Sequence, residues 1–332
     1  GDGMTIAEIA ARAGVSKTAV SRYLNDGYVS AEKREAIRKV IEETGYVPSR
    51  QAQMLRTGQS GLIGVILPRI DSESIGRIVR GISRVLGSSS YQLLPANTEN
   101  HAEKELEYLD VFRKGRVDGI LLVATMLTPA HRRAIRECQV PVVAEGQYLS
   151  DASCVYHDDH GAAHALTQEL IGAGCRRIAY FGVTTRDKAA GLARRQGFLE
   201  GLGEARISVD EALMATCDFS VESGAEACTR LLDSGVDFDG IFCATDSIAI
   251  GAMGVLHARG RRVPQDVKIV GVGHSRISGL VRPCLTTAHY FYEKSGEEAA
   301  RILLEIIQGG VDMHQQIKLG YEIVRRESTA AE

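Results

Sequence analysis

Histidine and acidic side chains between Tyr156 and His164 have the types and spacing that most suggest metal chemistry. His160 and His164 are four residues apart, which places two imidazoles on one helix face where they can bind a divalent ion. The segment lacks a third ligand and the glutamate of an H-E-x-x-H motif. We therefore predict no metal site, and we expect Asp158 or Asp159 to cap a helix here.

Two glycine-containing segments begin like enzyme motifs but do not complete them. Residues 273–277, Gly-His-Ser-Arg-Ile, start like a nucleophile elbow, yet isoleucine stands where a second glycine must relieve the strained turn. Residues 172–177, Gly-Ala-Gly-Cys-Arg-Arg, start like a dinucleotide-binding fingerprint, but they follow a predicted helix and lack its third glycine. We predict no catalytic residues, no cofactor and no enzyme activity.

Polar side chains near the N-terminus are of the types that recognise DNA. Three of them suit base edges, arginine above all because it can form two hydrogen bonds with guanine: Lys17, Thr18 and Arg22. Four shorter ones suit phosphate contacts, which set register without reading sequence: Thr5, Ser16, Ser21 and Asn25. Residues 16–25 are therefore predicted to form a helix that reads base edges in the major groove.

Two short helices joined by a tight bend must position these side chains. Thr5 and Ser16 are each placed to cap a helix, because a hydroxyl can accept a hydrogen bond from a free backbone N–H. Gly14 lies between the helices and allows the bend of a helix-turn-helix. A third helix, without a capping box, is expected from Ser30 to Gly45. The simpler interpretation is a three-helix packing unit with a polar surface.

The N-terminal segment also resembles a known family. Residues 5–25, TIAEIAARAGVSKTAVSRYLN, are similar position by position to the DNA-binding head of the lactose repressor family of bacterial transcriptional regulators. The resemblance implies that residues 1–47 form a helix-turn-helix domain whose partner is double-stranded operator DNA. In that family the head is followed by a hinge.

Residues 48–58 match the hinge helix and linker of that family. Pro48 ends the preceding helix, and the segment that follows is too short to be a stable helix alone in water. Leu55 corresponds to the leucine that the family inserts into the minor groove, which kinks the operator. The alternative interpretation is a plain interdomain linker.

From Leu62 onward, short β-branched runs alternate with segments of helical periodicity. Strands are predicted at residues 62–67, 91–94, 119–123, 140–143, 177–181, 240–243 and 267–272. Helices such as 102–114 and 162–173 lie between them. This alternation predicts an α/β fold of doubly wound parallel sheets, and the length requires two such sheets.

The resemblance implies that residues 59–332 form a two-lobed, periplasmic-binding-protein-like domain for effector binding and dimerisation. Lobe 1 would comprise about 59–157 and 290–317, and lobe 2 about 158–289 and 318–332. Family tetramers need a leucine heptad tail, and none follows Ser328. The resemblance therefore implies a homodimer.

A sugar or sugar-derivative effector in the cleft between the lobes is a further implication of the resemblance. Two polar side chains bind the ligand in the family: the arginine of the motif R-x-x-G-[FW] and the aspartate of the motif T-D-x-x-A-x-G. They correspond here to Arg194 and Asp246. Other positions that could offer hydrogen bonds or flat rings to a sugar are Arg69, Asp71, Ser74, Gln147, Tyr156, Phe219, Tyr290 and Tyr292. The alternative interpretation is architectural, with Arg194 and Asp246 as a buried ion pair and the rings as core residues.

The identity of the effector stays open at this point. Residues 273–275, Gly-His-Ser, depart from the family pattern of one aromatic and two acidic or amide residues, which suggests a ligand unlike those of the best-known members. Segments 67–74, 104–112 and 274–290 resemble sucrose-operon repressors within the family. The residues do not distinguish which sugar binds or whether that sugar is phosphorylated. They also leave open whether the sugar acts as an inducer or as a co-repressor.

Charge divides unevenly along the chain. The 39 basic and 42 acidic residues give a net charge of −3. Residues 1–57 hold nine basic and seven acidic residues, so the head carries +2 and the remainder −5. Because +2 is modest for a DNA-binding domain, we expect dimerisation and salt-sensitive phosphate contacts to supply affinity.

Cysteine spacing and apolar runs restrict the cellular setting. Seven scattered cysteines without C-x-x-C spacing predict reduced thiols, mostly in core positions. The longest apolar runs are far shorter than the roughly 20 residues of a membrane helix, and the sequence opens without a secretory signal. We expect a cytoplasmic protein with no membrane partner.

Taken together, the sequence features favour a DNA-binding repressor of a carbohydrate operon, and the alternative is a sugar-binding receptor of a transport system.

Overall fold

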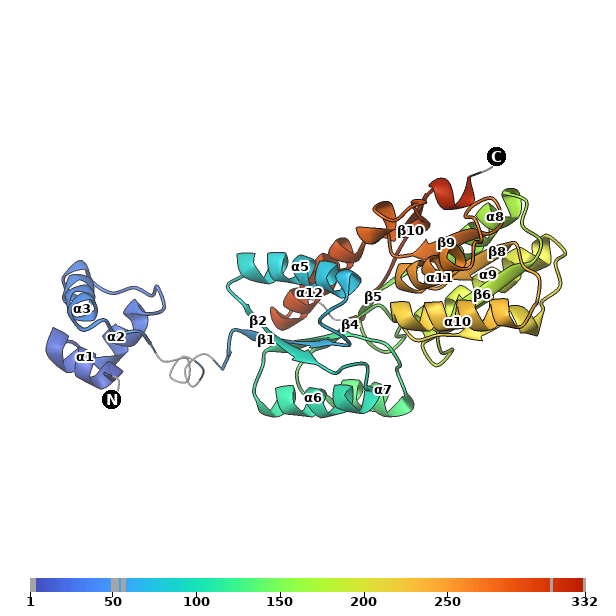
Figure 1. The fold of residues 1–332 in the computed structure, drawn as a ribbon. Helices are drawn as coiled ribbons and strands as arrows, with labels where there is room; N and C mark the ends of the chain where they lie inside the picture. The colour runs from blue at the N-terminus through green and yellow to red at the C-terminus, as the bar shows by residue number, and fades with distance from the viewer. Residues whose placement is uncertain (1–3, 49–53, 55–57, 311–312, 331–332) are drawn as a thin grey trace. The chain divides into compact units, whose positions relative to one another are not determined.

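Two compact units make up the chain, Gly1–Ser60 and Gly61–Glu332. The computed structural model describes residues 4–48, 54, 58–310 and 313–330 (Figure 1). The predicted hinge residue Leu55 lies outside the described residues. No described helix is long and apolar enough to cross a membrane.

Within residues 4–48 the first unit forms three helices, α1 (Ile6–Ala13), α2 (Lys17–Tyr23) and α3 (Ala31–Thr44). They pack around a small core of Ile9, Ala10, Ala19, Val20, Val29, Ile37 and Val40. The hydroxyl of Thr5 accepts a hydrogen bond from the Glu8 N–H, and the Glu8 carboxylate accepts one from the Thr5 N–H at 2.6 Å. Ser16 caps α2 by accepting a hydrogen bond from the Ala19 N–H at 3.1 Å. Gly14 is left-handed, with φ of 64°, so both predicted caps and the predicted bend are confirmed.

The first sheet of the larger unit has six parallel strands in the order β11-β5-β4-β3-β1-β2. Its strands are β1 (Leu62–Leu67), β2 (Gln92–Asn97), β3 (Gly119–Val123), β4 (Val142–Glu145), β5 (Cys154–His157) and β11 (Gln316–Leu319). Helices α5 (Glu73–Ser88) and α12 (Tyr292–Ile307) cover one face, and α6 (Ala102–Lys114) and α7 (Pro129–Glu137) cover the other (Figure 1). These elements form lobe 1.

The second sheet has six strands in the order β12-β10-β9-β8-β6-β7. Its strands are β6 (Ile178–Gly182), β7 (Met214–Thr216), β8 (Gly240–Cys243), β9 (Lys268–Val272), β10 (Thr286–Tyr290) and β12 (Tyr321–Val324). Helices α8 (Asp159–Gly172) and α9 (Arg194–Glu204) cover one face, and α10 (Val221–Asp233) and α11 (Asp246–Ala258) cover the other. Short helical segments are Lys188–Ala193, Glu211–Leu213, Ile277–Gly279 and Glu327–Thr329. These elements form lobe 2.

The predicted α/β fold with two doubly wound sheets is confirmed, with one refinement. Strand β12 runs antiparallel to β10, whereas the other pairs in the second sheet are parallel. The reason is connectivity: β10 ends at the passage to lobe 1, whereas β12 begins at Tyr321, directly after β11 of lobe 1 ends at Leu319, so the chain enters the second sheet at the end where β10 leaves it. Sequence periodicity did not predict five strands, which are β5, β7, β10, β11 and β12.

The chain passes between the lobes three times. It leaves the first sheet after His157, returns to lobe 1 between Tyr290 and Tyr292, and leaves it again after Leu319. Each passage is short, so the end of one sheet lies directly beside the start of an element in the other lobe. This arrangement brings residues of both lobes together at the carboxyl ends of the strands.

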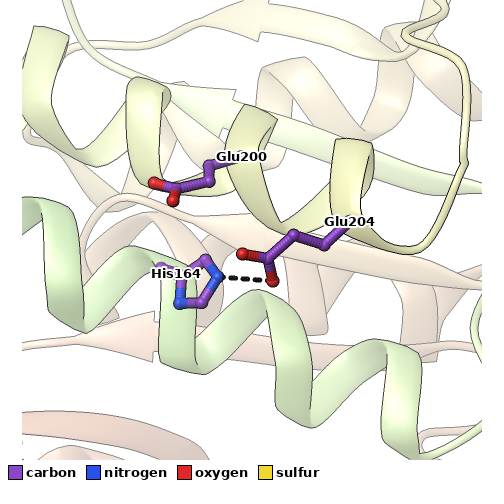
Figure 2. Close-up of side chains that lie close together, drawn as sticks. All are labelled: His164, Glu200 and Glu204. Atoms are coloured by element: carbon purple, nitrogen blue, oxygen red, sulfur yellow. Dashed lines mark hydrogen bonds and ion pairs between the residues drawn. The ribbon is translucent and has the colours of Figure 1, made fainter.

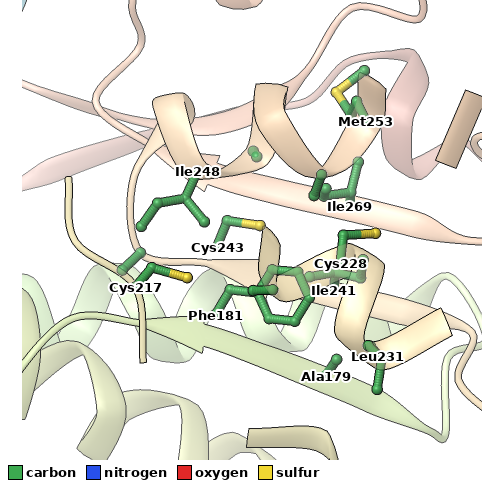
Figure 3. Close-up of a cluster of buried hydrophobic side chains, with 14 of the residues drawn as sticks. Ala179, Phe181, Cys217, Cys228, Leu231, Ile241, Cys243, Ile248, Met253 and Ile269 are labelled. Atoms are coloured by element: carbon green, nitrogen blue, oxygen red, sulfur yellow. The ribbon is translucent and has the colours of Figure 1, made fainter. Parts of the chain in front are cut away.

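Cysteines contribute to the core between the second sheet and helices α10 and α11. Cys217, Cys228 and Cys243 are buried there beside Phe181 and Ile248 (Figure 3). Burial raises the pKa of the Cys217 thiol to about 11 and that of Cys228 to about 12. All seven cysteines are free and five are buried, so the prediction of core thiols is confirmed.

A buried carboxyl on α6 makes the stability of lobe 1 sensitive to pH. Glu105 is only 2% exposed; the Thr125 hydroxyl donates a hydrogen bond to its Oε1 at 3.1 Å. Its Oε2 has no hydrogen-bond partner among the described residues, and His131 Nε2 lies 4.0 Å away. Burial raises the pKa of Glu105 to about 7, because the charged form loses solvation.

We predict that stability falls as the pH rises from about 5 to about 8. Between about pH 4.5 and about pH 7 the folded chain retains a proton on Glu105 that the unfolded chain has already released, and above about pH 7 the folded chain must bury the charged carboxylate. Glu105→Gln removes this titration, so its melting temperature should exceed the wild-type value by several degrees at pH 8, with a smaller difference at pH 5.5. Calorimetry checks this, with the exposed Glu107→Gln as control. An identical pH dependence of E105Q and wild type would contradict the prediction.

Candidate DNA-binding and effector sites

Helix α2 presents a polar face beside a buried apolar one. Ala19 and Val20 are buried in the core of the head, whereas Lys17, Thr18 and Arg22 are exposed. This alternation follows from helical geometry, since residues three or four apart share a face. The three predicted base-reading side chains are therefore exposed together on one short helix.

The predicted phosphate contacts surround this helix. The hydroxyls of Thr5 and Ser16 act as helix caps, and a hydroxyl that accepts a hydrogen bond can also donate one. Ser21 is half-buried and Asn25 is exposed. Each cap hydroxyl lies at a helix N-terminus, where the helix dipole favours a phosphate.

Arg34 is a basic residue of the head that sequence reasoning did not select. Its guanidinium lies 5.4 Å from the centroid of the Tyr23 ring and donates a hydrogen bond to the Gly27 carbonyl at 3.2 Å. These contacts link α3 to the end of α2 and hold the turn after the predicted reading helix.

Residues of both lobes meet where the parallel strands end. The Arg69 guanidinium of lobe 1 lies 4.4 Å from the ring centroid of Phe219 in lobe 2. Gln147 Nε2 of lobe 1 donates a hydrogen bond at 2.9 Å to Oδ1 of Asp187 in lobe 2. Gln147 and Asp187 are both buried. Burial lowers the pKa of Arg69 and raises that of Asp187, as expected for charges that have lost water.

Arg194 is paired with Asp159 rather than with Asp246. Its Nε donates a hydrogen bond to Asp159 Oδ1 at 2.8 Å, and its Nη1 donates to the Ala244 carbonyl. The Tyr290 hydroxyl donates to the same Asp159 oxygen at 2.9 Å, and the Tyr290 ring centroid is 5.3 Å from the guanidinium carbon. Sequence reasoning assigned Asp159 only to a helix start. The structure makes it the anionic centre of this group.

Asp246 begins α11 and holds a loop of the same lobe. Its Oδ1 accepts a hydrogen bond from the Thr287 hydroxyl at 2.6 Å, and its Oδ2 accepts one from the Ser275 N–H at 2.7 Å. The side chain is buried, and burial raises the pKa of this carboxyl. Asp246 thus fixes residues 273–276, the segment that departs from the family pattern.

The predicted aromatic residues divide into two groups. Tyr290 and Tyr292 contact the His157 ring, with centroid distances of 4.8 and 5.1 Å. Tyr156 packs against Tyr148 at 5.4 Å and against the apolar core on the other side of the first sheet. Neighbouring residues of a strand point to opposite faces, so Tyr156 does not join the group around His157.

Asp71 and Ser74 lie at the start of α5. Asp71 is exposed, and the Ser74 hydroxyl lies 2.9 Å from that of Ser72. No described contact brings either of them to Arg194 or Asp246. Two other residues of α5, Glu73 and Arg77, make a contact between the lobes that sequence reasoning missed.

That contact joins α5 to the loop held by Asp246. Arg77 of α5 donates hydrogen bonds to the carbonyls of Gly273 and His274 at 3.3 and 2.9 Å. The Glu73 carboxylate accepts hydrogen bonds from the Arg276 N–H at 3.1 and 3.0 Å. Glu73 and Arg77 also form an ion pair at 3.0 Å. The four-residue spacing of Glu73 and Arg77 indicates that they can pair on one helix face, but the sequence gives no sign of their contact with residues 273–276.

The histidine-rich segment begins α8 as predicted. Asp158 caps the helix, because its Oδ1 accepts a hydrogen bond from the Gly161 N–H at 3.0 Å. His157 is buried and its Nε2 lies 3.2 Å from Glu145 Oε1. His160 and His164 point instead toward α9, where each contacts a glutamate.

A helix-turn-helix head and a two-lobed α/β domain together define a ligand-responsive, DNA-binding transcriptional regulator. The family model described as bacterial regulatory proteins, lacI family, matches residues 5–49, and one described as a periplasmic binding protein-like domain matches residues 167–329. The chain belongs to the lacI family, whose members are transcriptional regulators.

Several relatives match the chain over nearly its whole length. The sucrose operon repressor of Staphylococcus xylosus is 33% identical over 317 residues, covering 96% of this chain and 98% of that protein. The transcriptional regulator CelR of Thermobifida fusca is 33% identical over 335 residues, covering 98% of each. A solved CelR–cellobiose complex has a TM-score of 0.76 at 31% identity, covering 98% of this chain and 99% of that one. A lac repressor dimer bound to operator has a TM-score of 0.90 at 24% identity, covering 99% and 100%, and supports the fold.

We predict that Arg22→Ala weakens operator binding by about 1–3 kcal/mol and relaxes the preference at one base pair. The reason is that an exposed arginine on the reading helix can recognise guanine through two hydrogen bonds. Fluorescence anisotropy over a set of single-base operator variants, taken from DNA beside the gene, measures both effects. The control is Arg38→Ala, since Arg38 is exposed on α3 and pairs with Glu35 and Glu42. Equal weakening on every operator variant would make Arg22 a phosphate contact.

Proposed function

We propose that this chain represses a carbohydrate-utilisation operon as a cytoplasmic homodimer and is not an enzyme. It binds a pseudo-palindromic operator, and a sugar or sugar derivative held between its lobes releases it or tunes its affinity. The observation that carries the proposal is the meeting of charged, amide and aromatic side chains from both lobes at the strand ends.

The chemistry of this meeting point suits a sugar. Charged and amide groups such as Arg69, Gln147 and Asp187 can hydrogen bond pairs of hydroxyls, and a flat ring such as Phe219 can pack on an apolar sugar face. Arg69 already covers the Phe219 ring at 4.4 Å. A sugar would compete with that stacking contact and would thereby change how the two lobes touch.

The names of the relatives support the carbohydrate class. They include a sucrose operon repressor, a ribose operon repressor and a regulator whose complex contains cellobiose. The proposed effector set also retains Arg194, Asp246, Tyr290 and Tyr292, with Asp71 and Ser74 as its less connected members. Tyr156 is left out of the set because it packs against the core on the other face of the first sheet.

Coupling between effector and DNA is proposed to start at the loop of residues 273–276. Asp246 holds this loop from lobe 2, while Glu73 and Arg77 hold it from lobe 1. An effector that changes the hydrogen bonds of Asp246 would therefore change the contact of the loop with α5. A full shift between two states requires about 10⁴-fold preference for one of them, or roughly 5.5 kcal/mol.

At the operator, the two α2 helices of the dimer would lie in successive major grooves. Lys17, Thr18 and Arg22 would read bases, and Thr5, Ser16, Ser21 and Asn25 would contact phosphates. Leu55 would insert into the minor groove and kink the central base step. Movement of the lobes would separate the hinges and lower operator affinity.

A sugar receptor of a transport system is the second candidate, favoured by the match to a periplasmic binding protein-like domain. The head with its accessible polar face argues against it. Anisotropy with upstream operator fragments, titrated with a sugar panel at several salt concentrations, separates the two. Absence of salt-sensitive DNA binding with every upstream fragment would defeat the repressor proposal.

We predict that Phe219→Ala and Asp246→Asn each raise the sugar concentration for half-maximal operator release by at least about fivefold, the lower end of typical coupling energies. Phe219→Ala removes the ring face, and Asp246→Asn retains the size of the side chain but removes its charge. The same anisotropy titration gives the release curves, and melting temperatures confirm folding.

The matched control for these variants is Asp233→Asn. Asp233 forms an exposed ion pair with Arg259 at 2.9 Å in lobe 2, and its loss should leave the release curve unchanged. If F219A and D246N both released the operator at the same sugar concentration as the wild type, Phe219 and Asp246 would not belong to the effector site.

A further inference from the structure

Helices α8 and α9 carry two matched pairs of histidine and glutamate on the outer side of lobe 2. His160 Nε2 lies 2.7 Å from Glu200 Oε2, and His164 Nε2 lies 2.8 Å from Glu204 Oε2. Each pair of like residues is four positions apart, so each helix presents its two side chains on one face. Figure 2 shows the hydrogen bond between His164 and Glu204, and it shows Glu200 on the same helix as Glu204 with its carboxylate pointing to the left of the view.

The ligand atoms of this cluster converge. One atom each from His164, Glu200 and Glu204 lies within 4.8 Å of the others, which is the one such group among the residues that the structure describes. Ligands around a tetrahedral zinc ion, at bond lengths of 2.0–2.2 Å, lie about 3.4 Å apart. Small rotations of surface side chains are sufficient to close the difference.

A rigid backbone supports the cluster. The two helices pack so closely that a Cβ atom on Gly197 would lie 2.2 Å from the His160 carbonyl oxygen. Gly201 faces Thr167 with a comparable lack of space, its Cβ position being 2.7 Å from Thr167 Cγ2. Because both glycines lie in the α9 segment that bears Glu200 and Glu204, the spacing between the carboxylates and the imidazoles is set by backbone contact.

We propose that His164, Glu200 and Glu204 form a binding site for a late first-row divalent metal ion such as Zn²⁺, with His160 as the neighbour that contacts Glu200. Imidazole and carboxylate together suit zinc, whereas Mg²⁺ and Ca²⁺ prefer all-oxygen sites. His164 is 23% exposed and Glu204 53% exposed, so the ion has access from solvent. The sequence motif lacked a third ligand because the carboxylates come from the next helix of the fold.

The site lies further along the same two helices than a buried ion pair beside the crossings between the lobes. Helix α8 starts at Asp159 and α9 starts at Arg194, the buried pair at 2.8 Å. A metal ion that cross-links the two helices would hold this pair more firmly and would stabilise lobe 2. The metal site stands on its own geometry and does not require the proposed sugar effector.

The test uses the untagged full chain after treatment with a chelator. Titration calorimetry with Zn²⁺ should give one ion per chain, and Zn²⁺ should raise the melting temperature of the protein. Co²⁺, a spectroscopic substitute, should give visible absorption bands of a site with nitrogen and oxygen ligands. Mg²⁺ should produce none of these effects.

Single substitutions assign the ligands. His164→Gln, Glu200→Gln and Glu204→Gln should each weaken Zn²⁺ binding by at least about tenfold, since loss of even an outer-shell partner costs 10–100-fold. His160→Gln should weaken it as well. These side chains are on the surface, so the variants should melt near the wild-type temperature without metal.

The matched control is His257→Gln, an exposed histidine at the end of α11 in the same lobe. It should bind Zn²⁺ like the wild type. Absence of Zn²⁺ binding by the wild-type chain, or binding that survives H164Q, E200Q and E204Q unchanged, would overturn the proposal. Operator binding of the metal-free chain is measured in parallel, so a failed metal site is distinguished from a failed repressor.

Discussion

A buried ion pair beside the crossings between the lobes is the interaction on which the rest of the larger unit depends. Asp159 opens α8, Arg194 opens α9, and Tyr290 closes β10, yet the three side chains form one hydrogen-bonded group. Removing one partner of a buried pair costs about 3–5 kcal/mol, because the remaining charge is left without compensation. This group therefore fixes the starts of two helices to the point where the chain returns to lobe 1.

The contacts that hold the lobes together use the same groups that suit a polar ligand. Gln147 donates a hydrogen bond to Asp187, and the Arg69 guanidinium packs on the Phe219 ring. Asp246 accepts a hydrogen bond from the loop of residues 273–276, which α5 of the other lobe also contacts. A ligand that competes for these groups changes the free energy of the lobe contact directly. Coupling of this kind needs no long pathway within the unit, since binding and lobe contact share side chains.

Much of the architecture was predictable from local patterns. Strands at Leu62–Leu67, Gly119–Val123 and Gly240–Cys243 match their predicted bounds because central parallel strands are buried on both faces and read as continuous apolar runs. Strands β11 and β12 lie at sheet edges, contain exposed and half-buried residues but no fully buried one, and have no such run. Tyr156 was selected by resemblance, but its position between Val155 and His157 directs it to the opposite face of the strand.

The sequence by itself determined the features that depend on neighbours within a few residues. These are the caps at Thr5 and Ser16, the bend at Gly14 and the helix start at Asp158. Only the tertiary structure decided which distant residues meet. It paired Arg194 with Asp159 across 35 positions and Glu73 with Arg276 across 203. It also placed two glutamates of α9 beside the histidines of α8. The physical reason is that such contacts are set by helix packing and by strand order in a sheet, which no short stretch of sequence encodes.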